Sequence, residues 1–254
     1  MLDFVYYPIS GVLWLWHTVF AAGLPDNVAW TATIVFVVLT LRALLLKPFL
    51  AQVRWQQKLV ELQPQMREIQ QRHTGDRAKQ AEALTKLQRE HGFNMLSGFV
   101  PMIAQAVVFL GLYHVLNAFD AAAAGNYFLD GGQVQSFLQA NLFGAPLSAT
   151  MVHAGPQLGA VAAVAVPLMG VAAVATHLTA RISIARQPAA TPAAPGAGMM
   201  NALALWVFPA TVIVGGAFLP VAILLYWVTN NAWTLVQQQL VYRRLDKESA
   251  RTKS

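Results

Sequence analysis

A single arginine stands inside a long apolar stretch of this sequence. Residues 28–49 read VAWTATIVFVVLTLRALLLKPF, long enough to cross a bilayer as a helix, and Arg42 lies near one end. A guanidinium stays charged in proteins, so at membrane depth it must reach the headgroups, pair with other groups or face water. Lys47 follows after roughly 7 Å of helix rise, which leaves snorkelling open as an alternative to a hydrated cavity.

A second stretch, residues 220–241, carries polar and aromatic side chains in two helical stripes. One stripe consists of Tyr226, Asn230, Trp233 and Gln237, and the other of Trp227, Asn231, Thr234 and Gln238. An unsatisfied amide in lipid costs on the order of a few kcal/mol, so this face should point into the bundle or toward water. Together with Arg42, it favours a water-filled cavity open toward the cytoplasm over snorkelling.

Patterns typical of enzymes do not occur in this sequence. It has no cysteine, which excludes disulfides, thiolate metal sites and cysteine nucleophiles. The motifs G-x-S-x-G, H-E-x-x-H and G-x-x-x-x-G-K-[ST] do not occur, and no acidic residue lies in a predicted span. His177 has no second ligand at metal-binding spacing on its helix. We therefore predict no enzymatic activity, no catalytic residue, no metal and no cofactor.

The composition is that of a polytopic membrane protein. Hydrophobic residues make up 56% of the 254 and charged residues 11%, and the apolar residues fall in long blocks. None of the 17 Lys and Arg precedes Arg42 or lies between Phe93 and Arg181. The positive-inside rule therefore predicts residues 51–94, 181–200 and 242–254 to be cytoplasmic, and the N-terminus and the loop 117–156 to be outside.

The predicted fold class is an all-α polytopic membrane protein with five transmembrane helices. The spans are expected at residues 28–50, 97–116, 157–180, 202–217 and 220–241. The aromatic residues of 1–27, interrupted by Pro8 and Gly11, predict an extracytoplasmic interfacial helix, with a sixth span as the alternative. Within the outside loop, residues 134–143 are a candidate interfacial helix.

Residues 51–94 predict an antiparallel helical hairpin on the cytoplasmic face. A narrow apolar seam runs along its first helix, and a weaker seam along its second: Trp55, Leu59, Leu62, Met66 and Ile69, then Ala81, Leu84 and Leu87. Gly75 can end the first helix and Asp76 can cap the second, while Pro64 should bend or restart the first. The basic residues predict a solvated face beside anionic lipid, with docking to an acidic or RNA partner as the alternative.

At these residues the chain resembles the YidC/Oxa1/Alb3 family of membrane protein insertases. Three blocks carry the resemblance around the ELQPQM segment: Arg42 followed by KPF at 47–49, NMLSGFVPMIAQAVVFLGLYHVL at 94–116, and LPVAILLYWVTNNAWTLVQQQ at 219–239. The resemblance covers residues 6–244. It implies a protein of the bacterial cell membrane that inserts and helps fold integral membrane proteins, through a hydrophilic, positively charged groove open to the cytoplasm.

The resemblance also implies site residues and partners. It places the strategic arginine at Arg42 and further groove contacts at Gln105, Tyr226, Trp227, Asn230 and Thr234. The partners implied are nascent membrane proteins and lipid. The ribosome, the signal recognition particle pathway and the Sec translocon are candidates at the hairpin and basic tail, and no direct nucleic-acid function is expected.

Two departures from the family pattern limit what is carried over. There is no large extracytoplasmic domain ahead of the first span and no lipoprotein cysteine, and only about ten residues follow Arg244, so accessory roles of those parts are not expected. The alternative function is a transporter or channel with a cytoplasm-facing polar cavity. Against it, the sequence shows neither repeated halves nor a ring of pore-lining residues.

Overall fold

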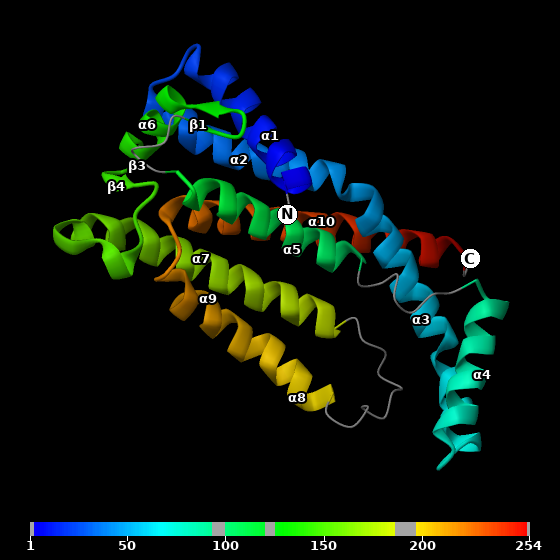
Figure 1. Ribbon diagram of the computed structural model, residues 1–254. Coiled ribbons are helices and arrows are strands. Elements are labelled where there is room, and N and C mark those ends of the chain that lie inside the picture. Colours follow the sequence, from blue (N-terminus) through cyan, green and yellow to red (C-terminus); the bar gives the residue numbers. More distant parts are fainter. Residues whose placement is uncertain (1–2, 93–99, 120–124, 186–196, 253–254) are drawn as a thin grey trace. The chain divides into compact units, whose positions relative to one another are not determined.

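The computed structural model describes residues 3–92, 100–119, 125–185 and 197–252, and most of them are helical (Figure 1). Residues 186–196 of the predicted cytoplasmic loop 181–200 and the start of the predicted second span at 97–99 lie outside the described residues. In chain order the helices are α1 (Asp3–Ala21), α2 (Asp26–Leu44), α3 (Leu46–Arg72), α4 (Arg77–Glu90), α5 (Val100–Asn117), α6 (Gly131–Gln139), α7 (Leu158–Ala185), α8 (Ala197–Ala202), the π-helix η4 (Leu203–Val207), α9 (Phe208–Gly216) and α10 (Val221–Thr252).

Three helices in the described part of the chain are long and apolar enough to cross a membrane. They cover Asp26–Leu44, Gly155–Ala185 and Gly198–Gly216, and a shorter apolar helix covers Ile103–Asn117. α10 is not in this set, because amides and charged residues fill its second half. The chain is thus a predominantly helical protein with several apolar helices, as an all-α membrane protein requires, and the five-span arrangement stays a proposal.

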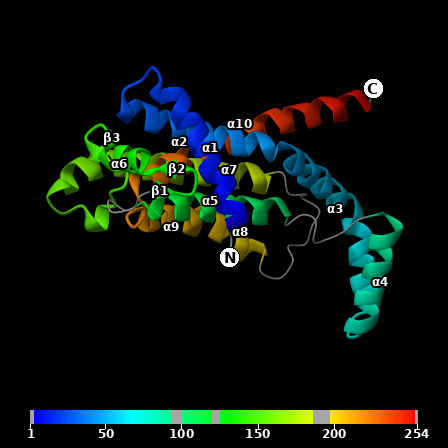
Figure 2. The same ribbon diagram turned by 45° about the horizontal axis from the view of Figure 1, so that its top comes forward.

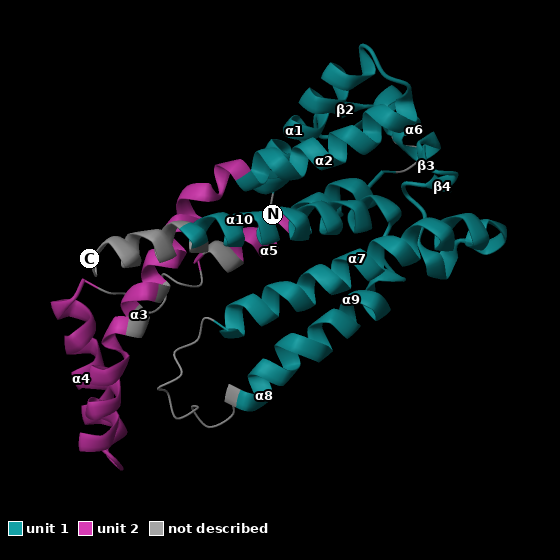
Figure 3. Ribbon diagram, turned by 180° about the vertical axis from the view of Figure 1, so that it is seen from behind, with its two compact units in different colours: residues 1–42, 110–254 teal, residues 43–109 magenta. Residues whose placement is uncertain are grey.

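The chain divides into two compact units (Figure 3). The first comprises residues 1–42 and 110–254, and the second residues 43–109. In the first unit α7 packs along α10 on one side and α9 on another. The small residues of α7 allow this close approach: Ala172 and Ala173 are buried together with Val212 of α9, and Trp227 and Val228 of α10 pack against them.

In the second unit α4 packs against α3. Leu62 of α3 and Leu87 of α4 are buried, and Asp76 caps α4 by accepting a hydrogen bond from the backbone N–H of Lys79 at 3.0 Å. Asp76 therefore acts as expected. α3 ends at Arg72 with His73 as its C-cap, and Gly75 lies in the turn that follows, with a φ of +94° that glycine adopts without steric cost.

The two helices differ in detail from the expected pattern. α3 continues through Pro64 as one helix, which excludes a restart there and leaves a bend as the expected effect of the proline. Ala81 is exposed, whereas Gln80, Ala83 and Leu84 are half-buried. The inner side of α4 therefore includes Leu84 and Leu87, as expected, but not Ala81.

Residues 125–157 form a folded cap rather than a loop with one interfacial helix. The helix α6 begins at Gly131, three residues before the expected position, because Asp130 and Gln133 form a reciprocal capping box. Two short antiparallel ladders flank it: β1 (Gly125–Asn126) with β2 (Leu129–Asp130), and β3 (Asn141–Leu142) with β4 (Ala145–Pro146). The 3-10 turns η2 (Met151–His153) and η3 (Gly155–Gln157) then lead into α7.

The cap holds the first turns of two long helices. Ser136 of α6 accepts a hydrogen bond from the indole N–H of Trp30 and donates one to Asp26, each at 2.9 Å, and both residues belong to α2. The backbone N–H groups of Val221 and Ala222 donate to the carbonyls of Ala149 and Leu147 at 3.0 and 2.9 Å. The starts of α2 and α10 are therefore fixed to one structure.

α1 packs against α2 and buries a histidine between them. His17 stacks on Trp30 with ring centroids 3.9 Å apart, and it is 5% exposed. Neither ring nitrogen has a hydrogen-bond partner among the described residues. Burial lowers the pKa of His17, and the nearby carboxylates of Asp26 and Asp130 oppose that shift. Folding thus favours the neutral imidazole relative to the unfolded chain.

The burial of His17 predicts a loss of stability in acid. The pKa of His17 is lower in the folded than in the unfolded chain. Its contribution to stability is therefore fully present above the unfolded pKa of about 6.5, and the free energy of unfolding decreases as pH falls below that value. We expect His17→Phe, which keeps the ring stack, to reduce the drop in melting temperature between pH 8 and pH 5 in detergent. His153→Gln, which changes an exposed histidine, is the control, and equal drops in wild type and His17→Phe would contradict the assignment.

Candidate functional site

The candidate site is built around Arg42, near the C-terminal end of α2. Arg42 is half-buried and lies 16 residues after Asp26, or about 24 Å along the helix axis. The hydrocarbon core of a bilayer is about 30 Å thick. If α2 crosses the membrane from the cap, the guanidinium therefore lies inside or at the far edge of the hydrocarbon.

The polar face of α10 holds this guanidinium. The Nε–H of Arg42 donates to the amide oxygen of Asn230 at 2.6 Å, and Nη2 donates to the hydroxyl oxygen of Thr234 at 2.8 Å and to the Asn230 carbonyl at 3.4 Å. In Figure 2, α10 comes close to α2 near the C-terminal end of α2. The Thr234 hydroxyl in turn donates to the same carbonyl at 2.9 Å, which leaves its lone pairs for the arginine.

All of these partners of Arg42 are neutral. In the part of the chain that the structure describes, no carboxylate lies within salt-bridge distance of Arg42, and its Nη1 has no hydrogen-bond partner. Hydrogen bonds from an amide and a hydroxyl offset part of the desolvation cost of the guanidinium, but they leave its charge uncompensated. The arrangement therefore positions a fixed positive charge and one unused donor group.

The two partners come from different stripes of the sequence pattern. Asn230 belongs to the stripe that starts at Tyr226, and Thr234 to the one that starts at Trp227. They are four residues apart, so they lie on one side of α10, one turn from each other. Tyr226 is 2% exposed and close enough to Arg42 to interact with it electrostatically. Sequence reasoning identified both partners but did not predict this pairing.

The other two site residues that the resemblance implies, Trp227 and Gln105, belong to different units of the chain. Trp227 packs against the buried cluster of Ala172, Ala173 and Val212, so its ring joins α10 to α7 and α9. Gln105 is half-buried on α5 and belongs to the second unit, residues 43–109. Its place in the groove stays a prediction from the resemblance.

Further polar atoms are buried on the same helix and on α7. Asn231 Nδ2, Gln238 Oε1 and Thr179 Oγ1 are inaccessible, and none has a partner among the described residues. The stripe pattern had indicated Asn231 and Gln238, but Thr179 carries no signal that distinguishes it from an ordinary helix-packing residue. Buried polar atoms of this kind ordinarily bind water or a ligand's polar groups.

A contact with α1 holds the part of α2 that carries Arg42. The indole N–H of Trp16 on α1 donates to the hydroxyl of Thr40 at 2.9 Å, two residues before Arg42. Trp16 also packs against Phe36 with ring centroids 4.8 Å apart. α1 therefore contacts α2 within one to two turns of Arg42. Sequence reasoning missed Trp16 and Thr40, because nothing in either stretch alone indicates that they meet.

The site can hold an anion or an acidic side chain by charge and hydrogen bonding. The described residues contain no group of three or more His, Cys, Asp or Glu side chains that could hold a metal ion.

Comparison with known proteins gives relatives that carry the same name. The family described as "60Kd inner membrane protein" matches residues 22–248. A protein of Mycobacterium tuberculosis named "Membrane protein insertase YidC" is 46% identical over 97% of this chain and 74% of its own length. The proteins of the same name from Mycobacterium leprae and Streptomyces avermitilis are 45% and 32% identical, over 97% and 96% of this chain and over 71% and 58% of their own lengths.

These matches confirm the family that the sequence motifs indicate. They extend over nearly the whole chain and include α2 and α10, the helices that form the Arg42 site. Together with the apolar helices, they identify a multi-pass bacterial membrane protein. The chain belongs to the 60Kd inner membrane protein family, that is, the YidC/Oxa1/Alb3 family.

Proposed function

We propose that this protein inserts integral membrane proteins into the bilayer and helps them fold, by way of a hydrophilic, positively charged groove open to the cytoplasm. The observation that carries the proposal is the guanidinium of Arg42, which neutral groups of α10 hold near the end of an apolar helix. The names of the related proteins supply the reaction class. No nucleotide is needed, because binding and lipid partitioning of the client supply the driving force.

The groove lowers the cost of moving a short polar segment across the membrane. A charged or amide-rich segment of the client would leave water for a site that already offers hydrogen-bonding groups, rather than for hydrocarbon. The uncompensated charge of Arg42 attracts acidic residues in the leading segment, while the client's apolar segment moves into lipid. The buried polar atoms of Asn231, Gln238 and Thr179 support a hydrated site, since water or client groups would satisfy them.

We further propose a topology of five spans with the N-terminus outside and the C-terminus in the cytoplasm. The spans are α2, α5, α7, the continuous stretch of α8, η4 and α9, and α10. In this topology α1 lies at the outer interface, the cap is outside, and the α3–α4 unit and the basic tail are cytoplasmic. The exposed basic residues of α3 and α4 would then face anionic headgroups, the ribosome, the signal recognition particle pathway or the Sec translocon.

The topology is tested by cysteine labelling. The natural chain has no cysteine, so Gln139→Cys on α6 and Gln71→Cys on α3 each introduce one exposed thiol. A membrane-impermeant maleimide added to intact cells should label the first and not the second, and permeabilisation should expose both. Labelling of both variants in intact cells would contradict the five-span arrangement.

The role of the charge is tested by two substitutions of Arg42. Arg42→Lys keeps the charge and should retain most insertion activity, whereas Arg42→Ala should lose it selectively for clients with acidic leading segments. One charge at a few Å contributes roughly 1 kcal/mol in water and several times that at a partly buried site, enough for a tenfold change. The measurement compares two clients in proteoliposomes that differ only in an acidic or neutral leading segment. Equal, near-normal insertion of both by Arg42→Ala would refute the mechanism.

The positioning role of α10 is tested separately with Thr234→Val. This substitution keeps the shape of the side chain and removes the oxygen that accepts from Nη2, so we expect insertion of the acidic client to fall a few-fold, in line with about 1 kcal/mol for one hydrogen bond. Thr229→Val is the matched control, because among the described residues the Thr229 hydroxyl bonds only to the Leu225 carbonyl of its own helix. A similar loss in both variants would indicate a general effect on α10 and not on the arginine.

A further inference from the structure

The tip of the β3–β4 hairpin displays an aromatic ring in an unusual backbone conformation. Phe143 has a φ of +50°, in the left-handed region that bulky residues rarely adopt, and Gly144 follows with a φ of +85°. The Phe143 side chain is 89% exposed. Packing of the ring against the described residues therefore does not offset the cost of the strained backbone.

The rest of the hairpin is firmly held. Leu142 pairs with Ala145, the backbone N–H of Leu147 donates to the Ala140 carbonyl at 3.0 Å, and Ala145 and Leu147 are fully buried. Asn141 is fixed to α2, since its backbone N–H donates to the Asn27 side chain at 2.9 Å. Phe143 is thus an exposed ring on a rigid turn, and its direction is set by the fold.

The hairpin is tied to the ends of the apolar helices. Leu147 accepts a hydrogen bond from the N–H of Ala222 at the start of α10, and the N–H of Val152 donates to the Ala217 carbonyl just after α9 at 3.3 Å. Phe143 lies four residues before Leu147, so at strand geometry its Cα atom is at most about 13 Å from that of Leu147, the residue that bonds the start of α10.

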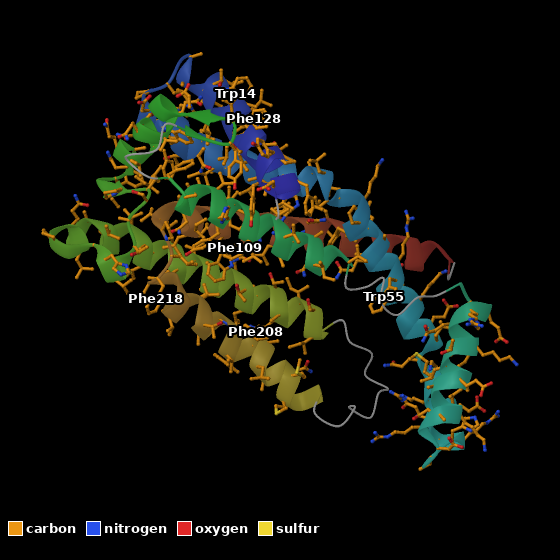
Figure 4. All side chains as sticks on the ribbon, in the orientation of Figure 1. Trp14, Trp55, Phe109, Phe128, Phe208 and Phe218 are labelled. Carbon is orange, nitrogen blue, oxygen red and sulfur yellow. The ribbon has the colours of Figure 1, made fainter. Side chains whose placement is uncertain are left out.

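Other exposed apolar side chains gather at the same helix ends. Phe218, in the turn between α9 and α10, is 61% exposed (Figure 4), and Leu158 at the start of α7 is 48% exposed. The sequence from 131 to 152 contains no charged residue. A surface that docks a soluble protein ordinarily has a polar or charged rim, whereas uncharged turns with exposed aromatics are typical of segments that lie in the membrane interface.

We propose that Phe143 is a lipid anchor that inserts its ring into the bilayer leaflet at the cap end of the helices. The occupant of this surface is the boundary between headgroups and acyl chains of the membrane in which the protein is embedded. Insertion of the ring into this boundary would remove the exposed phenyl group from water, and the free energy gained would offset the cost of the strained turn. The anchor fixes the depth of the cap, and through it the depth of the starts of α2 and α10. The proposal rests on the chain's being an integral membrane protein and not on its insertase activity.

The test is a depth measurement with an environment-sensitive fluorophore. Because the chain has no cysteine, Phe143→Cys allows a single NBD label at the tip of the hairpin. The full-length protein is reconstituted into phosphatidylcholine and phosphatidylglycerol vesicles that carry nitroxides on the headgroup, at a shallow or at a deep acyl position. We expect blue-shifted emission, strongest quenching by the shallow acyl nitroxide and protection from aqueous iodide.

Two labelled controls bracket the result. Gln139→Cys, exposed on α6 of the same cap, should be quenched by iodide, and Val214→Cys, 68% exposed on α9, should be quenched by the deeper nitroxide. A label at position 143 that iodide reaches as readily as at 139 would overturn the proposal. Protection from both iodide and every lipid nitroxide would also overturn it, since that outcome means that protein covers the ring. Insertion assays on the same vesicles report separately on the proposed function.

Discussion

The structure depends on the cost of placing one guanidinium among apolar helices. Arg42 cannot lose its proton, so its burial requires hydrogen-bond acceptors at fixed positions, and α10 supplies them through Asn230 and Thr234. Both are neutral. A carboxylate would have bound the arginine more tightly but cancelled its charge, whereas an amide and a hydroxyl hold the group and leave its field intact. The proposed attraction of an acidic client segment rests on this uncompensated charge.

One face of α10 packs against α7, and another face binds Arg42. Trp227 and Val228 pack against Ala172 and Ala173 of α7, which sets the rotation of the helix, while Asn230 and Thr234 face Arg42. The small side chains of α7 are therefore part of the same arrangement. A larger residue at either alanine would displace α10, and with it the acceptors of the arginine.

The cap adds a second constraint, because it fixes the positions of α2 and α10 along their helix axes. It binds the first turn of α2 through Ser136 and the first turn of α10 through Leu147 and Ala149. Two helices that start from the same structure keep their register over their length, and this register brings residue 42 of one opposite residues 230 and 234 of the other. Anchoring of the cap in the interface would set the depth of the whole arrangement.

The sequence by itself determined the apolar blocks, the anomalous arginine, the polar stripes of residues 226–238, the capping role of Asp76 and the family, because local periodicity, charge and motif order carry these features. Only the tertiary structure decided that Arg42 bonds one member of each stripe. Helical periodicity specifies a broad face, but the rotation of α10 is set by Trp227 packing on α7. Likewise the burial of His17, the Trp16 to Thr40 contact and the ladders around α6 arise between segments distant in sequence. Their register follows from long-range packing, which no local pattern encodes.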